Sequence, residues 1–251
     1  IYKTNQNYYQ FTWNQILSYN ADFGGDHNFS AFVAHESLLI QSSAIQGGKN
    51  QIVRPDGLEL GNAVEMSYLT SSTSTRKMES YFGQVRYSYK DKYFVDANLR
   101  ADGSSKFAKA NRWGIFPSMA FAWNAKNESF LEDVDAVSAL KLRLSYGETG
   151  QQEIGNYMYL AGYFQSTDQY DMAFMGKDGY YHYYTPRAYD PNIKWETTVT
   201  YNAGIDFGFW DGLVNGSIDI YRRDTRDLLN NVTTPLGAVV EVSEASTLTF
   251  V

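Results

Sequence analysis

The segment with the strongest ligand-binding character runs from Asp168 to Tyr189 and mixes aromatic with polar side chains. Aromatic faces stack on sugar rings, and neighbouring polar groups can hydrogen-bond to the sugar hydroxyls. The same composition suits a protein–protein interface, so substrate contact and partner contact both stay open. The candidate contact residues are Tyr170, Phe174, Tyr180, Tyr181, Tyr183, Tyr184 and Arg187.

Other residues that perform chemistry lack the spacing that the chemistry requires. The histidines, His27, His35 and His182, are far apart and form no His-x-x-His or Glu-x-x-His pattern, so we expect no metal site. The chain contains no Gly-x-Ser-x-Gly, P-loop or Gly-x-Gly-x-x-Gly sequence, so serine hydrolysis and nucleotide binding lack support. The sequence therefore predicts no catalytic residue and no cofactor.

Acidic residues gather at 132–135 and 224–227, but a glycosidase needs two carboxylates at a defined separation across a cleft. Solvated turn residues are the commoner interpretation of such pairs. The run Asp102-Gly103-Ser104-Ser105 offers oxygen donors for calcium, yet it lacks a full ligand loop and is typical of a turn after a strand. We therefore predict a binding protein and not an enzyme.

The composition narrows the class of protein further. Aromatic residues make up 16% of the 251 residues, with 21 Tyr, 15 Phe, 20 Gly and only 5 Pro, a balance that favours strands and turns. The net charge of −7, without basic clusters, argues against a nucleic-acid partner. The absence of cysteine excludes disulfides and thiolate metal sites. No apolar run approaches the ~18 residues of a membrane helix, but strands can also cross membranes.

Alternation of apolar and polar residues with a period of two predicts β-strands, because no helix produces that pattern. The alternation is clearest over residues 93–102, 140–147, 197–209 and 213–224. Weaker versions cover residues 9–20, 27–40, 80–89 and 113–123, and Pro117 interrupts the last of these. The sequence therefore predicts an all-β chain.

The segments between the predicted strands differ in length from one side to the other. Turns at 22–26, 90–91, 125–138 and 211–212 fall on one side, and the turn at 125–138 is expected to hold a helical turn at 128–133. Longer segments at 41–79, 103–111 and 150–194, and the chain beyond 225, fall on the other side. The Ser/Thr-rich run 70–75 is expected to be an exposed loop tip. Short turns opposite long loops are typical of an outer-membrane barrel.

The two faces of the predicted strands also favour a membrane barrel over a soluble sheet, although soluble sandwiches and barrels alternate as well. Aromatic residues stand at the ends of the apolar face, as an interfacial girdle would: Tyr93, Trp123, Tyr146, Phe207 and Phe209. The opposite face suits a watery or plugged lumen, and its predicted lumen-facing residues are Asp96, Asn98, Arg100, Lys141 and Arg143. A secreted all-β carbohydrate-binding or glycosidase domain, and a plain porin-like channel, remain the alternatives.

Several motifs, taken in order, resemble a known family. They are Tyr81–Tyr93, Arg100–Phe107, Arg112–Ser118, Leu140–Gln151, Ile154–Tyr157, Tyr189–Glu196 and Tyr221–Leu229. In this order and spacing they are similar to the C-terminal half of the barrel of SusC/RagA-type TonB-dependent transporters. The resemblance is dense from Leu17 to Leu229 and thins after Asn230.

The resemblance implies an outer-membrane importer of the Bacteroidota that takes up oligosaccharides or peptides. The expected fold is an antiparallel transmembrane β-barrel fragment, about 8–10 strands of a larger plugged barrel of about 22 strands. Residues 1–251 would form a partial barrel domain, with the plug and the N-terminal barrel strands absent from it. The expected partners are a SusD-like surface lipoprotein acting as a lid, TonB-ExbB-ExbD through the absent N-terminal part, and membrane lipid and lipopolysaccharide.

Overall fold

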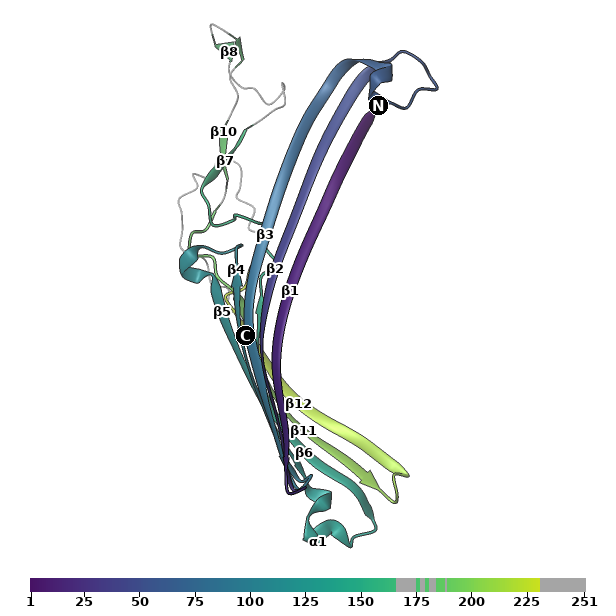
Figure 1. The fold of residues 1–251 in the computed structure, drawn as a ribbon, viewed down its shortest axis with the longest axis vertical. Helices are drawn as coiled ribbons and strands as arrows, with labels where there is room; N and C mark the ends of the chain where they lie inside the picture. The colour runs from purple at the N-terminus through teal and green to yellow at the C-terminus, as the bar shows by residue number, and fades with distance from the viewer. Residues whose placement is uncertain (166–174, 177–178, 181–183, 188, 231–251) are drawn as a thin grey trace.

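The computed structural model describes residues 1–165, 175–176, 179–180, 184–187 and 189–230, and it gives the backbone alone for the described parts of 163–187. Eight strands form one antiparallel sheet in the order β1-β2-β3-β4-β5-β6-β11-β12 (Figure 1). Their bounds are β1 Tyr2–Phe23, β2 His27–Ile52, β3 Ala63–Tyr89, β4 Tyr93–Ser104, β5 Trp113–Asn124, β6 Val137–Gln151, β11 Glu196–Phe209 and β12 Val214–Arg226. The predicted all-β class is confirmed, and the sheet is unclosed because its edge strands β1 and β12 do not pair.

The remaining elements are short. The 3-10 turns are η1 Leu60–Asn62, η2 Lys109–Asn111 and η3 Ala125–Asn127, and the α-helix is α1 Ser129–Glu132. The small strands β7 Gly162–Gln165 and β10 Tyr184–Arg187 pair with each other, as do β8 Met175–Gly176 and β9 Gly179–Tyr180. In the part of the chain that the structure describes, no helix is long and apolar enough to cross a membrane.

The predicted short turns gather at one end of the sheet, where Figure 1 also places α1. Turns of three or four residues join β1 to β2, β3 to β4 and β11 to β12. Lys90 and Asp91 both have φ of 53°, and Trp210 and Asp211 have φ of 51° and 53°. Two successive residues with positive φ give a hairpin turn that matches the right-handed twist of the flanking strands. The helical turn predicted at 128–133 is confirmed as α1.

The prediction of a long loop over residues 41–79, with 70–75 at its tip, is wrong. β2 continues to Ile52 and β3 begins at Ala63, with pairs such as Gln41↔Thr75 and Ser43↔Thr73. β4 leaves β3 at Met78, so the rest of β3 runs on for about 50 Å of strand at ~3.3 Å per residue. In Figure 1, β1, β2 and β3 continue together past β4 and β5 as a three-stranded arm.

Pro117 lies inside β5 at a position where the sheet tolerates it. Pro117 pairs with Leu99 of β4, whereas the β5–β6 ladder begins one residue later, at Ser118↔Gly147. Because proline has no amide hydrogen, it is found where a ladder ends or at an edge. The strand predicted at 113–123 is therefore confirmed despite its proline.

The buried apolar cluster lies at the loop end of the sheet. It consists of Phe107, Phe116 and Trp195, with Ile154 and Ile193 packed against it. The cluster joins the loop after β4, strand β5 and the segment before β11. Most large apolar residues of the strands are instead exposed on one sheet face. This distribution is the reverse of a soluble sandwich, which buries its apolar face between two sheets.

Candidate functional site

The polar face of β3 and β4 carries a connected network around Asp96. The carboxylate of Asp96 accepts hydrogen bonds from Arg86 Nε at 2.7 Å, Gln84 Nε2 at 2.8 Å and Asn98 Nδ2 at 2.6 Å. Further along the same face, Arg100 Nε donates to Asp102 Oδ2 at 2.8 Å. The sequence-predicted residues Asp96, Asn98 and Arg100 therefore share one face and take part in polar contacts along it.

A second network joins β6, β11 and β12 on the same face. Arg143 donates from Nε and Nη2 to the two carboxylate oxygens of Asp206, each at 2.8 Å. Its Nη1 lies 3.1 Å from Asp219 Oδ1, so one guanidinium bridges two carboxylates. Gly204 stands between them, and an added Cβ there would lie 2.5 Å from Asp219 Oδ1. The site therefore requires the absence of a side chain at this position.

Lys141 connects these two regions. Its Nζ lies 5.4 Å from the centroid of the Phe94 ring, within the range of a cation–π contact. The register explains the proximity, because Phe94 pairs with Ala122 and Ala122 pairs with Arg143. The structure thus brings all the predicted polar residues to one sheet face.

Some partners in these networks were missed by the sequence analysis. Asp206 and Asp219 lie on the polar faces of their strands by simple alternation, but their contact with Arg143 depends on the strand order β6-β11-β12. More than 40 residues separate β6 from β11 in the chain, so no local signal indicates that pairing. Arg86 was visible only as one polar residue of a weakly alternating segment.

The opposite face is apolar and bounded by aromatic residues. Leu99 in the middle of β4 is 56% exposed, and Ile220 of β12 is 74% exposed. Ring pairs near the short-turn ends of the strands are Tyr89 with Tyr93 and Phe207 with Phe209, and Tyr146 pairs with Tyr201 further along β6 and β11. An exposed apolar band flanked by aromatic girdles is the surface of a membrane barrel.

At the loop end, the segment after β4 folds into the buried cluster. Lys106 is 9% exposed and its Nζ donates to the backbone oxygen of Gln152 at 3.0 Å. Burial lowers the pKa of Lys106, because it removes the ammonium from water, and nearby Arg76 adds to the effect. Trp195 Nε1 donates to the Arg112 oxygen at 3.0 Å. These contacts tie the loops around 105–112, 152 and 195 together over the sheet.

The calcium alternative for Asp102–Ser105 finds no support. Asp102 is 5% exposed and its Oδ2 pairs with Arg100. Across the described residues, no group of three or more His, Cys, Asp or Glu side chains could hold a metal ion. Asp102, Gly103 and Ser104 are instead the last residues of β4, so the turn predicted over Asp102–Ser105 begins only at Ser105.

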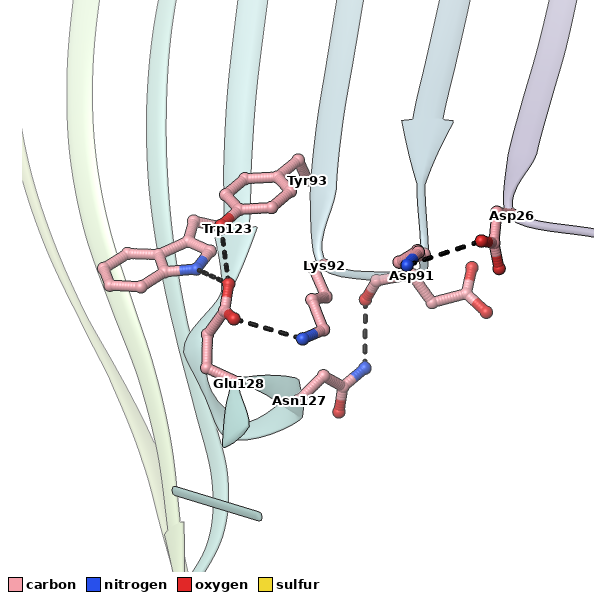
Figure 2. Close-up of polar contacts among 8 residues, drawn as sticks. Asp26, Asp91, Lys92, Tyr93, Trp123, Asn127 and Glu128 are labelled. Carbon is pink, nitrogen blue, oxygen red and sulfur yellow. Dashed lines mark hydrogen bonds and ion pairs between the residues drawn. The ribbon is translucent and has the colours of Figure 1, made fainter. Parts of the chain in front are cut away.

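At the short-turn end, Glu128 fastens the turn after β5 to β4 and β5 (Figure 2). Its carboxylate accepts hydrogen bonds from Tyr93 Oη at 2.6 Å, Lys92 Nζ at 3.1 Å and Trp123 Nε1 at 3.2 Å. These bonds, led by that from Tyr93, hold the pKa of Glu128 below its usual value. Asn127 Nδ2 also donates to the Asp91 oxygen at 3.0 Å, which links two neighbouring turns.

Two of the histidines lie apart on the apolar face of the sheet. His27 Nδ1 is 2.7 Å from Tyr87 Oη, and His35 Nε2 is 2.9 Å from Glu79 Oε1. His35 also stacks on Tyr81 with 4.8 Å between ring centroids. Each ring has its own protein partners, and His182 lies outside the described residues.

The aromatic candidates between 168 and 189 are only partly described. Tyr170, Phe174, Tyr181 and Tyr183 lie outside the described residues. Tyr180 is in β9, and Tyr184 and Arg187 are in β10, each described by its backbone. Their role in substrate or partner contact therefore stays a prediction.

Comparison with known proteins gives a consistent result. Residues 1–247 match the family model described as TonB dependent receptor-like, beta-barrel. The chain is 40% identical over 233 residues to the TonB-dependent receptor SusC of Bacteroides thetaiotaomicron, covering 91% of this chain and 22% of that protein. It is 35% identical over 220 residues to the TonB-dependent receptor P3 of Formosa agariphila, covering 85% of this chain and 21% of that protein.

Solved structures share the fold. The RagAB peptide importer in its closed-closed state superposes with a TM-score of 0.81 at 22% identity, over 93% of this chain and 25% of that chain. The open-open state of the same importer gives a TM-score of 0.77. The chain thus spans about a fifth to a quarter of the length of the proteins that it matches.

Proposed function

Since this chain belongs to the TonB-dependent receptor-like β-barrel family of the outer membrane, we propose that it forms part of the wall of a nutrient importer. In this proposal residues 1–251 are one part of a longer barrel whose remaining strands and plug lie elsewhere in the protein. The observation that carries the proposal is the division of the sheet into an exposed apolar face and a polar face with ion-pair networks. The polar face, with Asp96, Asn98, Arg100, Lys141 and Arg143, would line the lumen.

We further propose that the importer works with a SusD-like lipoprotein and takes up oligosaccharides or peptides, driven by TonB. The identity to SusC and the fold shared with the RagAB peptide importer support this assignment. The aromatic segment 168–189 supplies stacking surfaces that suit sugar rings and also a protein lid.

The test is to purify the protein that carries this chain from its native source. We expect a band far larger than 28.5 kDa in the detergent-extracted outer membrane, with a lipoprotein copurifying. A soluble band near 28.5 kDa would contradict the importer proposal. Calorimetric titration of the purified complex with neutral oligosaccharide and peptide mixtures would then separate the two substrate classes.

The proposed contact residues are tested in the same titration. Tyr184→Ala should weaken substrate binding by about two- to tenfold, which corresponds to ~0.5–1.5 kcal/mol for one stacking ring. Tyr2→Ala, on the far end of the arm, is the matched control. Equal substrate affinities for both variants and the wild type would show that Tyr184 does not contact substrate. Loss of the copurifying lipoprotein from the Tyr184→Ala variant would instead assign Tyr184 to the contact with the lid.

A further inference from the structure

We propose that the turn between β5 and β6, residues 125–136, is a membrane anchor that inserts Phe130 into the phospholipid leaflet at the short-turn end of the barrel. The other turns at this end have three or four residues, whereas this one contains η3 and α1. The inference rests on the proposed function, because it takes the apolar sheet face as the face that contacts lipid.

The position of the turn points toward lipid. Glu128 is held by Tyr93 and Trp123, which are paired residues on the apolar face. Figure 2 shows the Glu128 carboxylate reaching up to both side chains from the turn below them. Aromatic side chains with a polar tip mark the level of the lipid headgroups in membrane proteins. The turn therefore lies against the headgroup level of the apolar face.

The turn carries large apolar side chains that are exposed. Phe130 is 65% exposed and Val134 is 37% exposed. The turn between β11 and β12 also carries exposed apolar residues, with Trp210 at 60% and Leu213 at 81%. The two turns are joined, because Trp210 N donates to the Ala136 oxygen at 3.1 Å. Exposed apolar residues on two joined turns, at the end of a sheet whose apolar face is exposed, favour an interaction surface there.

Two charged groups of the turn, Lys126 and Glu128, have partners within the protein, which lowers the cost of placing them near hydrocarbon. Lys126 Nζ donates to the backbone oxygens of Leu131, Glu132 and Val134 at 2.9 to 3.1 Å. The Glu128 charge is offset by Lys92. Neighbouring Glu132, Asp133 and Asp135 are exposed and make no ion pair with any described residue, so they suit the aqueous side of the turn. The turn thus carries both exposed apolar and exposed acidic side chains, a composition that suits an interfacial anchor.

A docking surface for a periplasmic protein is the rival explanation for an exposed Phe130. The attachment of the turn to Tyr93 and Trp123 through Glu128 favours lipid, because both aromatic residues lie on the apolar sheet face. The anchor needs no partner other than the bilayer in which the barrel already stands.

The experiment uses the full-length protein, with any cysteine elsewhere in it replaced, in phospholipid vesicles. The chain itself has no cysteine, so Phe130→Cys, Asp133→Cys and Leu99→Cys can each be spin-labelled singly. Power saturation compares the accessibility of each label to oxygen, which concentrates in lipid, and to a water-soluble nickel chelate. We expect the label at 130 to be several-fold less accessible to nickel than the label at 133, and to resemble the label at 99.

The possible outcomes distinguish failure of the membrane anchor from failure of the proposed function. A label at 130 as accessible to nickel as that at 133, with the label at 99 in lipid, overturns the anchor alone. Labels at 99 and 130 that are both aqueous overturn the proposed function as well. A label at 130 that is shielded only after periplasmic extract is added assigns the surface to a protein and overturns the lipid anchor. If Phe130→Cys does not fold, a spin label at Val134→Cys measures the same accessibility to oxygen and nickel.

Discussion

At the scale of single residues, Glu128 has a role that the chain sequence does not reveal. Its hydrogen-bond donors, Lys92, Tyr93 and Trp123, come from two strands and the turn before them. A glutamate in an acidic turn is ordinarily solvated, yet the side chain of this one is only 15% exposed. Glu128 therefore fixes the turn to the strand ends rather than merely solubilising it.

We predict that Glu128→Gln loosens this end of the sheet. The pKa of Glu128 is lowered in the folded protein, so its contribution is complete above its unfolded value of about 4.5 and is lost as pH falls through the lower folded value. Urea unfolding of the refolded protein should therefore show lower stability for Glu128→Gln at neutral pH, and a smaller loss of stability on acidification than the wild type shows.

The matched control for that prediction is Glu132→Gln, four residues along the same turn. Glu132 is exposed and its side chain makes no hydrogen bond or ion pair with any described residue, so its variant should follow the wild-type pH profile. If both variants behave alike, the contacts of Glu128 do not stabilise the turn.

Phe107 provides a second prediction at this scale, because it is fully buried against Trp195 with 5.1 Å between ring centroids. Phe107→Ala should cost ~3–5 kcal/mol, the range for removing a buried aromatic side chain. Protease accessibility of the loop end, read against urea concentration, measures the loss. Leu58→Ala, at a residue 76% exposed, should change stability by about 0.5 kcal/mol or less. Equal effects would mean that the loop cluster is not a core.

At the scale of elements, each strand has an apolar face and a polar face, and a single lysine substitution on either face can distinguish the two. Leu99→Lys places an ammonium on the apolar face and should destabilise folding into the membrane by ~2–4 kcal/mol if Leu99 lies at mid-bilayer. Folding into lipid vesicles, followed by the shift in gel mobility of the folded barrel, measures this cost. Asn98→Lys, one residue earlier on the polar face, is the control and should fold almost as the wild type does.

The two predicted faces depend on strand periodicity, which is local, whereas the ends of β2 and β3 depend on pairing. Beyond the apolar band, residues 41–52 and 63–77 alternate weakly, because the pairs there are mostly polar on both faces. Backbone hydrogen bonds continue the ladder regardless of side-chain type. A polar, Ser/Thr-rich segment therefore looks like a loop in the sequence and is a strand in the structure.

At the scale of the whole molecule, the three-stranded arm and the short turns stand at opposite ends of the sheet (Figure 1). The long-loop end of an outer-membrane barrel faces outward and the short turns face the periplasm. In intact cells that carry the full-length protein, a membrane-impermeant maleimide should label Ser72→Cys on the arm. It should label Asp133→Cys only after the outer membrane is permeabilised. The opposite labelling pattern would invert the topology.

The amino-acid sequence was enough to predict the class of fold, the positions of most strands, the side of the short turns and the family. Each of these follows from local patterns: a period of two, tight-turn residues and motif spacing. The five predicted polar residues also share a face, because alternation alone assigns faces within each strand.

Which side chains meet depends on how the strands pair. Arg143 bridges Asp206 and Asp219 because β11 pairs with β6 across a long intervening segment, and Glu128 meets Tyr93 and Trp123 because β4 pairs with β5. The length of the arm was likewise set by continued pairing and not by side-chain pattern. Periodicity is a property of one strand, so it can be seen directly in the sequence. Register is a property of two paired strands, so it is known only once the fold shows which strands pair.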